Sequence, residues 1–200
     1  MELIQQEFER VQDRLQRATA ALEEARQEYA VIGGNAVIHW ITQVRPTAFR
    51  FTQDVDILIR REDLPAIKSA MTTAGFIYRH AAGIDFFMDG PQSTFDQAVH
   101  LVFAGEKVRK EYLLPAADVA ESVPGKNYHV ISLEALVRMK LTSFRLKDAT
   151  HVDDLLRVGL IDETWLSKFP PELAARLQHV IDQFEPLSPE LRNLNLNSDE

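Results

Sequence analysis

The segment 29–59 constrains the fold more than any other part of this 200-residue chain. It begins with the apolar run Tyr-Ala-Val-Ile, continues with the glycine pair Gly33-Gly34, and ends with Asp54-Val-Asp56 followed by Ile-Leu-Ile. Side chains of a strand alternate between its two faces, so both aspartates are expected on one face, while Val55, Ile57 and Ile59 face a core on the other. The sequence therefore predicts a strand, a helix, and a second strand that presents two carboxylates side by side.

The two carboxylates indicate a cation site. A hard divalent cation takes oxygen ligands and accepts phosphate oxygens in the same coordination shell. We therefore expect Asp54 and Asp56 to hold Mg²⁺ (or Mn²⁺). The glycine pair lies where a strand passes into a helix, so backbone N–H groups gather there and a phosphate can approach closely. The expected phosphate-binding residues are Gly33, Gly34 and Asn35.

The order of these motifs resembles the nucleotidyltransferase superfamily, in which an apolar strand, a glycine pair, a helix and a D-x-[DE] strand follow one another. The pattern R-x-T-x-D-x-D over residues 50–56 looks like the AbiEii toxin-like branch of that superfamily. The resemblance continues from Lys140 to Asp153, which is similar to the helical K-x4-R-x-K-D-x4-D element of the branch. It covers roughly residues 29–160.

The resemblance implies transfer of a nucleotidyl group from an NTP to RNA, especially tRNA, or to a protein acceptor. It also implies a toxin–antitoxin role, with an antitoxin as partner. Lys140 would neutralise a phosphate, and Lys147 falls near the same helical face at i+7, so a basic stripe is available. The expected nucleotide-binding residues are Gly33, Gly34, Asn35, Arg50, Thr52, Lys140, Arg145 and Lys147.

The superfamily usually has a third carboxylate on a later strand beside the D-x-D pair. In this chain the corresponding strand is 97–103, and the aligned residue is His100. We expect His100 to be catalytic together with Asp54 and Asp56, because a neutral imidazole can accept a proton or bind a metal. The alternative donors are Asp85, Asp96 and Glu106. The alternative function is a nucleotide-binding or regulatory module that does not turn over.

The composition narrows the classes of protein further. The formal net charge of −8 disfavours a protein that coats nucleic acid through a general basic surface. Cysteine is absent, which excludes disulfides and zinc–thiolate sites and agrees with the reducing cytoplasm, where we expect the protein. No apolar run approaches the length of a membrane span, and the N-terminus lacks a secretory signal pattern, so we expect no membrane association.

We divide the chain into four parts. Residues 1–28 are predicted to form an amphipathic helix that docks on its own domain, because apolar residues recur at spacings of four and three. Residues 29–131 are the nucleotidyltransferase-like core, of the α/β (α+β) class: a mixed, mainly antiparallel sheet of about five strands with helices on one face. Residues 132–185 form a C-terminal helical region, and residues 186–200 a flexible tail.

Several local features follow from turn and charge patterns. Asp63 is predicted to cap a helix that runs to about Ala74, and Ser132 to cap another. The segment 104–127 reads as loop, and 128–131 as an edge strand. On the helices that follow, surface ion pairs are predicted to join three acidic residues to three basic ones. These residues are Asp148, Asp153 and Asp154, with Arg145, Lys147 and Arg157.

Overall fold

The computed structural model describes residues 2–47 and 52–183, so Arg50 and the predicted tail 186–200 lie outside the described residues. The helices are α1 (Glu2–Glu24), α2 (Gly33–Val44), α3 (Leu64–Thr73), α4 (Leu133–Ser143), α5 (Leu146–Arg157) and α6 (Pro171–Gln183). The strands are β1 (Ala30–Ile32), β2 (Val55–Ile59), β3 (Ile77–Ala81), β4 (Ile84–Met88), β5 (Val99–Phe103), β6 (Ser122–Pro124) and β7 (His129–Ile131). Short 3₁₀ turns lie at Arg61–Asp63, Phe95–Gln97, Val119–Glu121 and Glu163–Lys168.

Within the described part of the chain the strands form one seven-stranded sheet in the order β3-β4-β5-β2-β1-β7-β6. The pairs β1–β2, β3–β4, β4–β5 and β6–β7 are antiparallel, whereas β2–β5 and β1–β7 are parallel. The prediction of a mixed, mainly antiparallel sheet is therefore confirmed. The expected number of strands, about five, was too low, and the strand that local sequence patterns do not reveal is β6, which lies in the segment 104–127 that reads as loop.

The edge of the sheet differs from the prediction. The segment predicted as an edge strand is β7, which lies between β1 and β6, and the true edge is β6 in a stretch that reads as loop. β6 ends at Pro124, which cannot donate to a ladder and is tolerated in a strand mainly at an edge. Three residues that include a proline carry little strand signal, so only the pairing with β7 defines this element.

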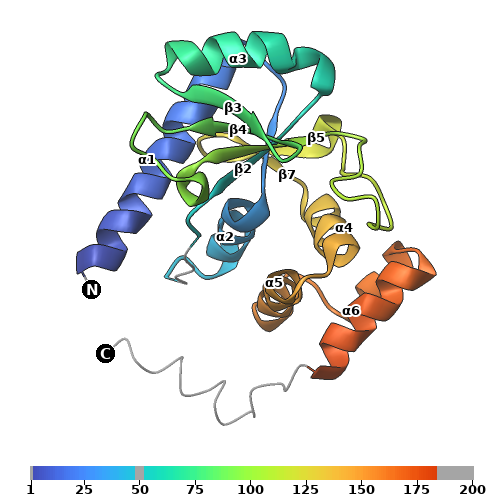
Figure 1. Ribbon diagram of the computed structural model, residues 1–200. Coiled ribbons are helices and arrows are strands. Elements are labelled where there is room, and N and C mark those ends of the chain that lie inside the picture. The colour runs from blue at the N-terminus through green and yellow to red at the C-terminus, as the bar shows by residue number, and fades with distance from the viewer. Residues whose placement is uncertain (1, 48–51, 184–200) are drawn as a thin grey trace.

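Helices cover both faces of the sheet, not one face as predicted (Figure 1). The helices α1 and α3 pack on one face, and the C-terminal helices and α2 pack on the other. The central strand β2 explains this arrangement, because Leu58 is as fully buried as Ile57 and Ile59, although it points to the opposite side. A strand with both faces buried needs cover on each side, and these two helical layers provide it.

The N-terminal helix is part of the domain core. Val11, Leu15, Ala18 and Leu22 of α1 are buried in the same cluster as residues of β2 and β5. The helix ends at Glu24, four residues before the predicted boundary. No helix within the described residues is long and apolar enough to cross a membrane.

The two predicted helix caps differ in outcome. The Ser132 hydroxyl accepts a hydrogen bond from the backbone N–H of Ala135 at 3.3 Å, so the capping prediction for α4 is confirmed. Asp63 was expected to cap α3, but it forms no side-chain capping bond there. Asp63 is the last residue of the 3₁₀ turn Arg61–Asp63, and its backbone is helical. A capping residue usually has an extended backbone, so Asp63 does not have the conformation of a cap.

Candidate active site

The sheet brings three separate segments to one place. In the antiparallel pairing of β1 with β2, Ile32 lies opposite Asp56, so the glycine pair that follows Ile32 begins beside the D-x-D motif. In the parallel pairing of β2 with β5, Asp56 lies opposite His100. Asp54 immediately precedes β2. The sheet register alone thus gathers residues that lie far apart in the sequence.

Asp54, Asp56 and His100 form a cluster with the donor set of a cation site. One ligand atom from each residue lies within 4.8 Å of the others. The distance between Nδ1 of His100 and Oδ1 of Asp56 is 3.8 Å. All three side chains are partly exposed, so a bound cation could also contact a substrate. Two carboxylates and one imidazole at this separation fit a single divalent cation.

The two carboxylates have different electrostatic surroundings. Burial raises the pKa of Asp56, and the neighbouring Asp54 carboxylate raises it further, while His100 partly opposes this effect. Burial would also raise the pKa of Asp54, but a hydrogen bond from Thr52 and the charge of Lys147 outweigh it and lower that pKa. Like charges held side by side in this way favour a cation between them.

The residues around the D-x-D motif require glycine at positions 33 and 34. Gly33 has a φ of +67°, and a Cβ atom built on it would lie 1.9 Å from Oδ2 of Asp56. A Cβ atom on Gly34 would lie 2.7 Å from Oγ1 of Thr52. The backbone of α2 therefore approaches the D-x-D motif so closely that side chains at these two positions do not fit.

Two further side chains hold the backbone that leads into β2. Nδ2 of Asn35 donates to the backbone carbonyl of Asp54 at 2.9 Å, and Asn35 is 2% exposed. Nη1 of Arg14 donates to the backbone carbonyl of Gln53 at 3.0 Å. Thr52 also contributes, because its hydroxyl donates to Oδ1 of Asp54 at 2.7 Å. Asn35 and Thr52, both predicted to bind nucleotide, thus position Asp54.

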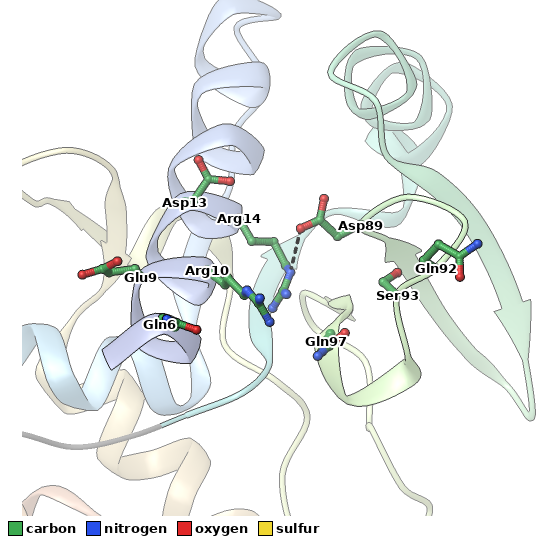
Figure 2. Close-up of a pocket in the computed structure, with 9 residues that line it drawn as sticks. All are labelled: Gln6, Glu9, Arg10, Asp13, Arg14, Asp89, Gln92, Ser93 and Gln97. Carbon is green, nitrogen blue, oxygen red and sulfur yellow. Dashed lines mark hydrogen bonds and ion pairs between the residues drawn. The ribbon is translucent and has the colours of Figure 1, made fainter. Parts of the chain in front are cut away.

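Sequence reasoning missed Arg14. It lies on α1 and is 4% exposed, and its Nε atom lies 3.2 Å from Oδ2 of Asp89, the residue that follows β4 (Figure 2). These residues border a polar groove of about 560 Å³ between α1 and the segment 89–97. The sequence carries no signal for this role, because Arg14 looks like the other charged residues of an amphipathic helix, and only its burial shows that it needs fixed partners.

The predicted basic stripe splits into a buried half and an exposed half. Nζ of Lys140 lies 3.1 Å from Oδ1 of Asp148, and both side chains are almost fully buried. Arg145 and Ser143 also donate to this carboxylate, at 2.7 and 2.8 Å. In contrast, Lys147 is exposed, and its Nζ lies 4.0 Å from Oδ2 of Asp54.

Asp148 does pair with Arg145 as predicted, but the prediction that it lies on the surface was wrong, because the fold encloses it between α4 and α5. Burial opposes ionisation, but Arg145, Lys140 and Ser143 outweigh it and lower the pKa of Asp148 to about 2. Asp153 does form the predicted surface pair, with Nε of Arg157 at 2.9 Å.

The alternative third donors are engaged elsewhere. Asp85 accepts a hydrogen bond from the Tyr78 hydroxyl and interacts with Nδ1 of His80 at 3.1 Å. Glu106 forms a two-pronged pair with Arg61, at 2.5 and 2.7 Å. Asp96 lies in the 3₁₀ turn before β5 and not among the residues that line the cavity beside the cluster. Of the four residues considered, His100 is the one that the structure brings to the D-x-D pair.

A cavity of about 610 Å³ adjoins the cluster. Its polar lining includes Gly33, Asp54, Asp56, His100, Lys140, Arg145, Lys147 and Asp148. Its lining also includes exposed apolar side chains, namely Ile84, Phe95 and Val108. A cavity of this size with cations, carboxylates and apolar surface is suited to a ligand that has both charged and apolar parts.

Comparison with known proteins supports the fold. No protein-family model and no curated protein matches the sequence. The crystal structure of an antigenic nucleotidyltransferase-like protein from Paracoccidioides brasiliensis aligns with 92% of this chain and 91% of its own, at 19% identity and a TM-score of 0.51. A crystal structure of ANT(2'')-Ia in complex with adenylyl-2''-tobramycin aligns with 84% of this chain and 95% of its own, at 13% identity and a TM-score of 0.46. The first of these similarities shows that the chain has a nucleotidyltransferase-like fold, as its motifs predict.

Proposed function

We propose that the protein transfers a nucleotidyl group from an NTP to an acceptor hydroxyl, with a divalent cation, Mg²⁺ or Mn²⁺, held by Asp54 and Asp56. The observation that carries this proposal is the meeting of these two carboxylates with His100 beside a cavity of about 610 Å³. The nucleotidyltransferase-like fold supports the same chemistry.

In the proposed reaction, the acceptor oxygen forms a bond to the α-phosphorus of the NTP. The bond from that phosphorus to the bridging oxygen of the β-phosphate breaks, and pyrophosphate leaves. The hydroxyl proton passes to a basic group of the site, and His100 is the candidate that the sequence predicts. A bound cation would supply charge compensation for the phosphate oxygens during this displacement.

The protein groups have separate roles in this proposal. The exposed Lys147 and Arg145, which both line the cavity, neutralise the phosphates of the NTP. Gly33 and Gly34 allow the backbone at the start of α2 to approach them. Lys140 contributes its charge from the wall of the cavity, where Asp148 holds its ammonium group. The remaining proposed contact is Arg50, outside the described residues.

The acceptor and the partner are proposed from the motif resemblance to the AbiEii toxin-like branch. The acceptor is RNA, in particular tRNA, or a protein side chain. An antitoxin is the corresponding partner. The alternative proposal is a nucleotide-binding or regulatory module, and the observation that favours it is the imidazole of His100 where a third carboxylate is usual.

The test uses each common NTP radiolabelled at the α-phosphate, together with Mg²⁺ or Mn²⁺ and a preparation of tRNA or total cell protein. Label that becomes attached to a macromolecule, with release of pyrophosphate, supports transfer. The matched controls are Asp54→Asn, Asp56→Asn and chelation of the cation, each of which should abolish the label. Metal-dependent NTP binding without any transfer would favour the alternative module, and absence of both binding and transfer would refute the proposal.

A further inference from the structure

We propose that His100 is a cation ligand through Nδ1, and that this nitrogen makes the D-x-D site prefer a first-row transition dication such as Mn²⁺ over Mg²⁺. The inference rests on the proposed function, since it concerns the same site. It changes the role of His100 from proton acceptor to ligand, and it is carried by the hydrogen bonding and the packing of the imidazole ring.

The hydrogen bond of the second ring nitrogen fixes which nitrogen is available. Nε2 of His100 lies 3.1 Å from the backbone carbonyl oxygen of Phe95. A carbonyl oxygen only accepts hydrogen bonds, so Nε2 must carry the proton. In the neutral ring Nδ1 therefore has a free lone pair. Metal-binding histidines commonly donate the other ring N–H to a backbone carbonyl or a carboxylate in this way, which fixes the tautomer and the ring orientation.

Nδ1 lies close to an oxygen of the D-x-D pair. Nδ1 lies 3.8 Å from Oδ1 of Asp56, which is too long for a hydrogen bond. In the neutral ring, the imidazole lone pair and a carboxylate oxygen at this distance are both electron donors, so they repel without a cation. A cation in contact with both groups would convert this repulsion into attraction, and Asp54 lies close enough to supply a further oxygen.

The ring of His100 is held in place by its surroundings. Its centroid lies 4.5 Å from that of the Phe95 ring and 6.2 Å from that of Phe86, which approaches it edge-on. The strand pairing places its backbone opposite Asp56. A ligand that is fixed before the cation arrives loses little conformational freedom on binding. The ring of His100 should therefore increase the affinity of the site for a cation.

The donor set determines which cation is preferred. Mg²⁺ is small and hard, binds oxygen, and retains several waters. Replacing a carboxylate by a neutral imidazole removes a negative charge that attracts Mg²⁺, and it adds a nitrogen donor that transition metals bind more strongly. Mn²⁺ also binds oxygen ligands, so the nitrogen ligand is tested by the change of the Mn²⁺/Mg²⁺ affinity ratio in a His100 variant and not by the ratio of the wild-type protein alone.

The experiment measures Mn²⁺ binding directly by electron paramagnetic resonance, without nucleotide and without a turnover assay. Pulsed spectra of the bound ion should contain the coupling of a directly coordinated ¹⁴N nucleus. Competition with Mg²⁺ gives the ratio of the two affinities. In the wild-type protein we expect Mn²⁺ to bind more tightly than Mg²⁺, and we expect the ratio of the two affinities to depend on His100.

The variants separate the ligand role from a structural role. His100→Ala should remove the nitrogen coupling and weaken Mn²⁺ binding by about tenfold or more, with a smaller effect on Mg²⁺. His100→Asp should shift the preference towards Mg²⁺, which mere damage to the fold would not do. His179→Ala on α6 removes an exposed imidazole that does not line the cavity, and it should change neither value.

The outcomes also separate this inference from the proposed function. If both cations bind in a manner that depends on Asp54 and Asp56, but nitrogen coupling is absent and the affinity ratio does not change in His100→Ala, the inference is wrong and the proposed function stands. If neither cation binds, with or without NTP, both are wrong. Circular dichroism of each variant verifies that it has folded.

Discussion

Gly33 and Asp56 are packed so closely that a Cβ atom on the glycine would overlap the carboxylate, at 1.9 Å from Oδ2. This contact joins the two halves of the motif that defines the chain. The glycine is needed both for its positive φ and for the space that Asp56 occupies. The backbone at the start of α2 and the cation site are therefore a single structural unit.

The substitution Gly33→Ala tests this unit. It should destabilise the protein by more than the strain of a positive φ alone, which is about 1–2 kcal/mol, because Asp56 must also move. Gly75→Ala is the matched control, since Gly75 has a φ of +88° with no atom within 4 Å of the added Cβ. Denaturant unfolding gives both free energies. Equal losses in the two variants would mean that Asp56 does not restrict position 33.

The two aspartates should respond oppositely to removal of charge. Asp56 has a raised pKa, so its ionised form costs stability, and the cost grows as pH rises through its titration. Asp54 has a lowered pKa, so its ionised form contributes stability that is lost as pH falls through its titration. At neutral pH and with metal chelated, Asp56→Asn should raise the melting temperature and Asp54→Asn should lower it.

Both aspartate variants should nevertheless lose metal-dependent nucleotide binding, as measured by isothermal titration calorimetry with Mg²⁺ or Mn²⁺ and NTP. A variant that keeps the wild-type affinity would show that its carboxylate is not a ligand. Shifts of the melting temperature in the same direction for both variants would contradict the electrostatic description of the pair.

Asp148 should stabilise the fold strongly. Its pKa of about 2 against an ordinary value of 3.8 corresponds to about 2 kcal/mol at neutral pH. Because the folded-state pKa is depressed, this stability is present above the ordinary value and is lost as pH falls towards about 2. Asp148→Asn leaves the buried Lys140 without its charge partner and should cost about 3 kcal/mol or more.

The matched control for Asp148 is Asp153→Asn, which breaks the exposed pair with Arg157 and should cost below about 1 kcal/mol. Chemical denaturation of the wild type and both variants across the acidic pH range is the measurement. The pH dependence should flatten only in Asp148→Asn. A small loss in that variant would mean that the Lys140–Asp148 pair does not stabilise the folded state.

Arg14 should couple the N-terminal helix to the cation site. Arg14→Gln removes a buried charge that donates to the backbone of Gln53, beside Asp54, and should cost about 2 kcal/mol of stability. The cation affinity should also fall, because the backbone that precedes β2 loses an anchor. Arg10→Gln is the control, since Arg10 is an exposed residue of the same helix. Unchanged Mn²⁺ affinity in folded Arg14→Gln would exclude this coupling.

Short-range patterns in the sequence determined much of the fold and part of the site. Alternating apolar residues, the glycine pair and the two aspartates identified β1, α2 and β2, since each depends on neighbours within a few residues. The alignment of strand 97–103 brought His100 into consideration. The spacing of apolar residues in α1 likewise follows from local periodicity, and α1 packs through that face.

Only the tertiary structure decided which charged residues are buried and with which partners. Arg14 and Asp148 read as ordinary helix-surface charges, yet one contacts Gln53, which is 39 residues away, and the other is enclosed with Lys140. The strand β6 exists because β7 pairs with it. Local propensity does not encode these features, because the energy of a charge or of an unpaired backbone group depends on which distant groups displace water around it.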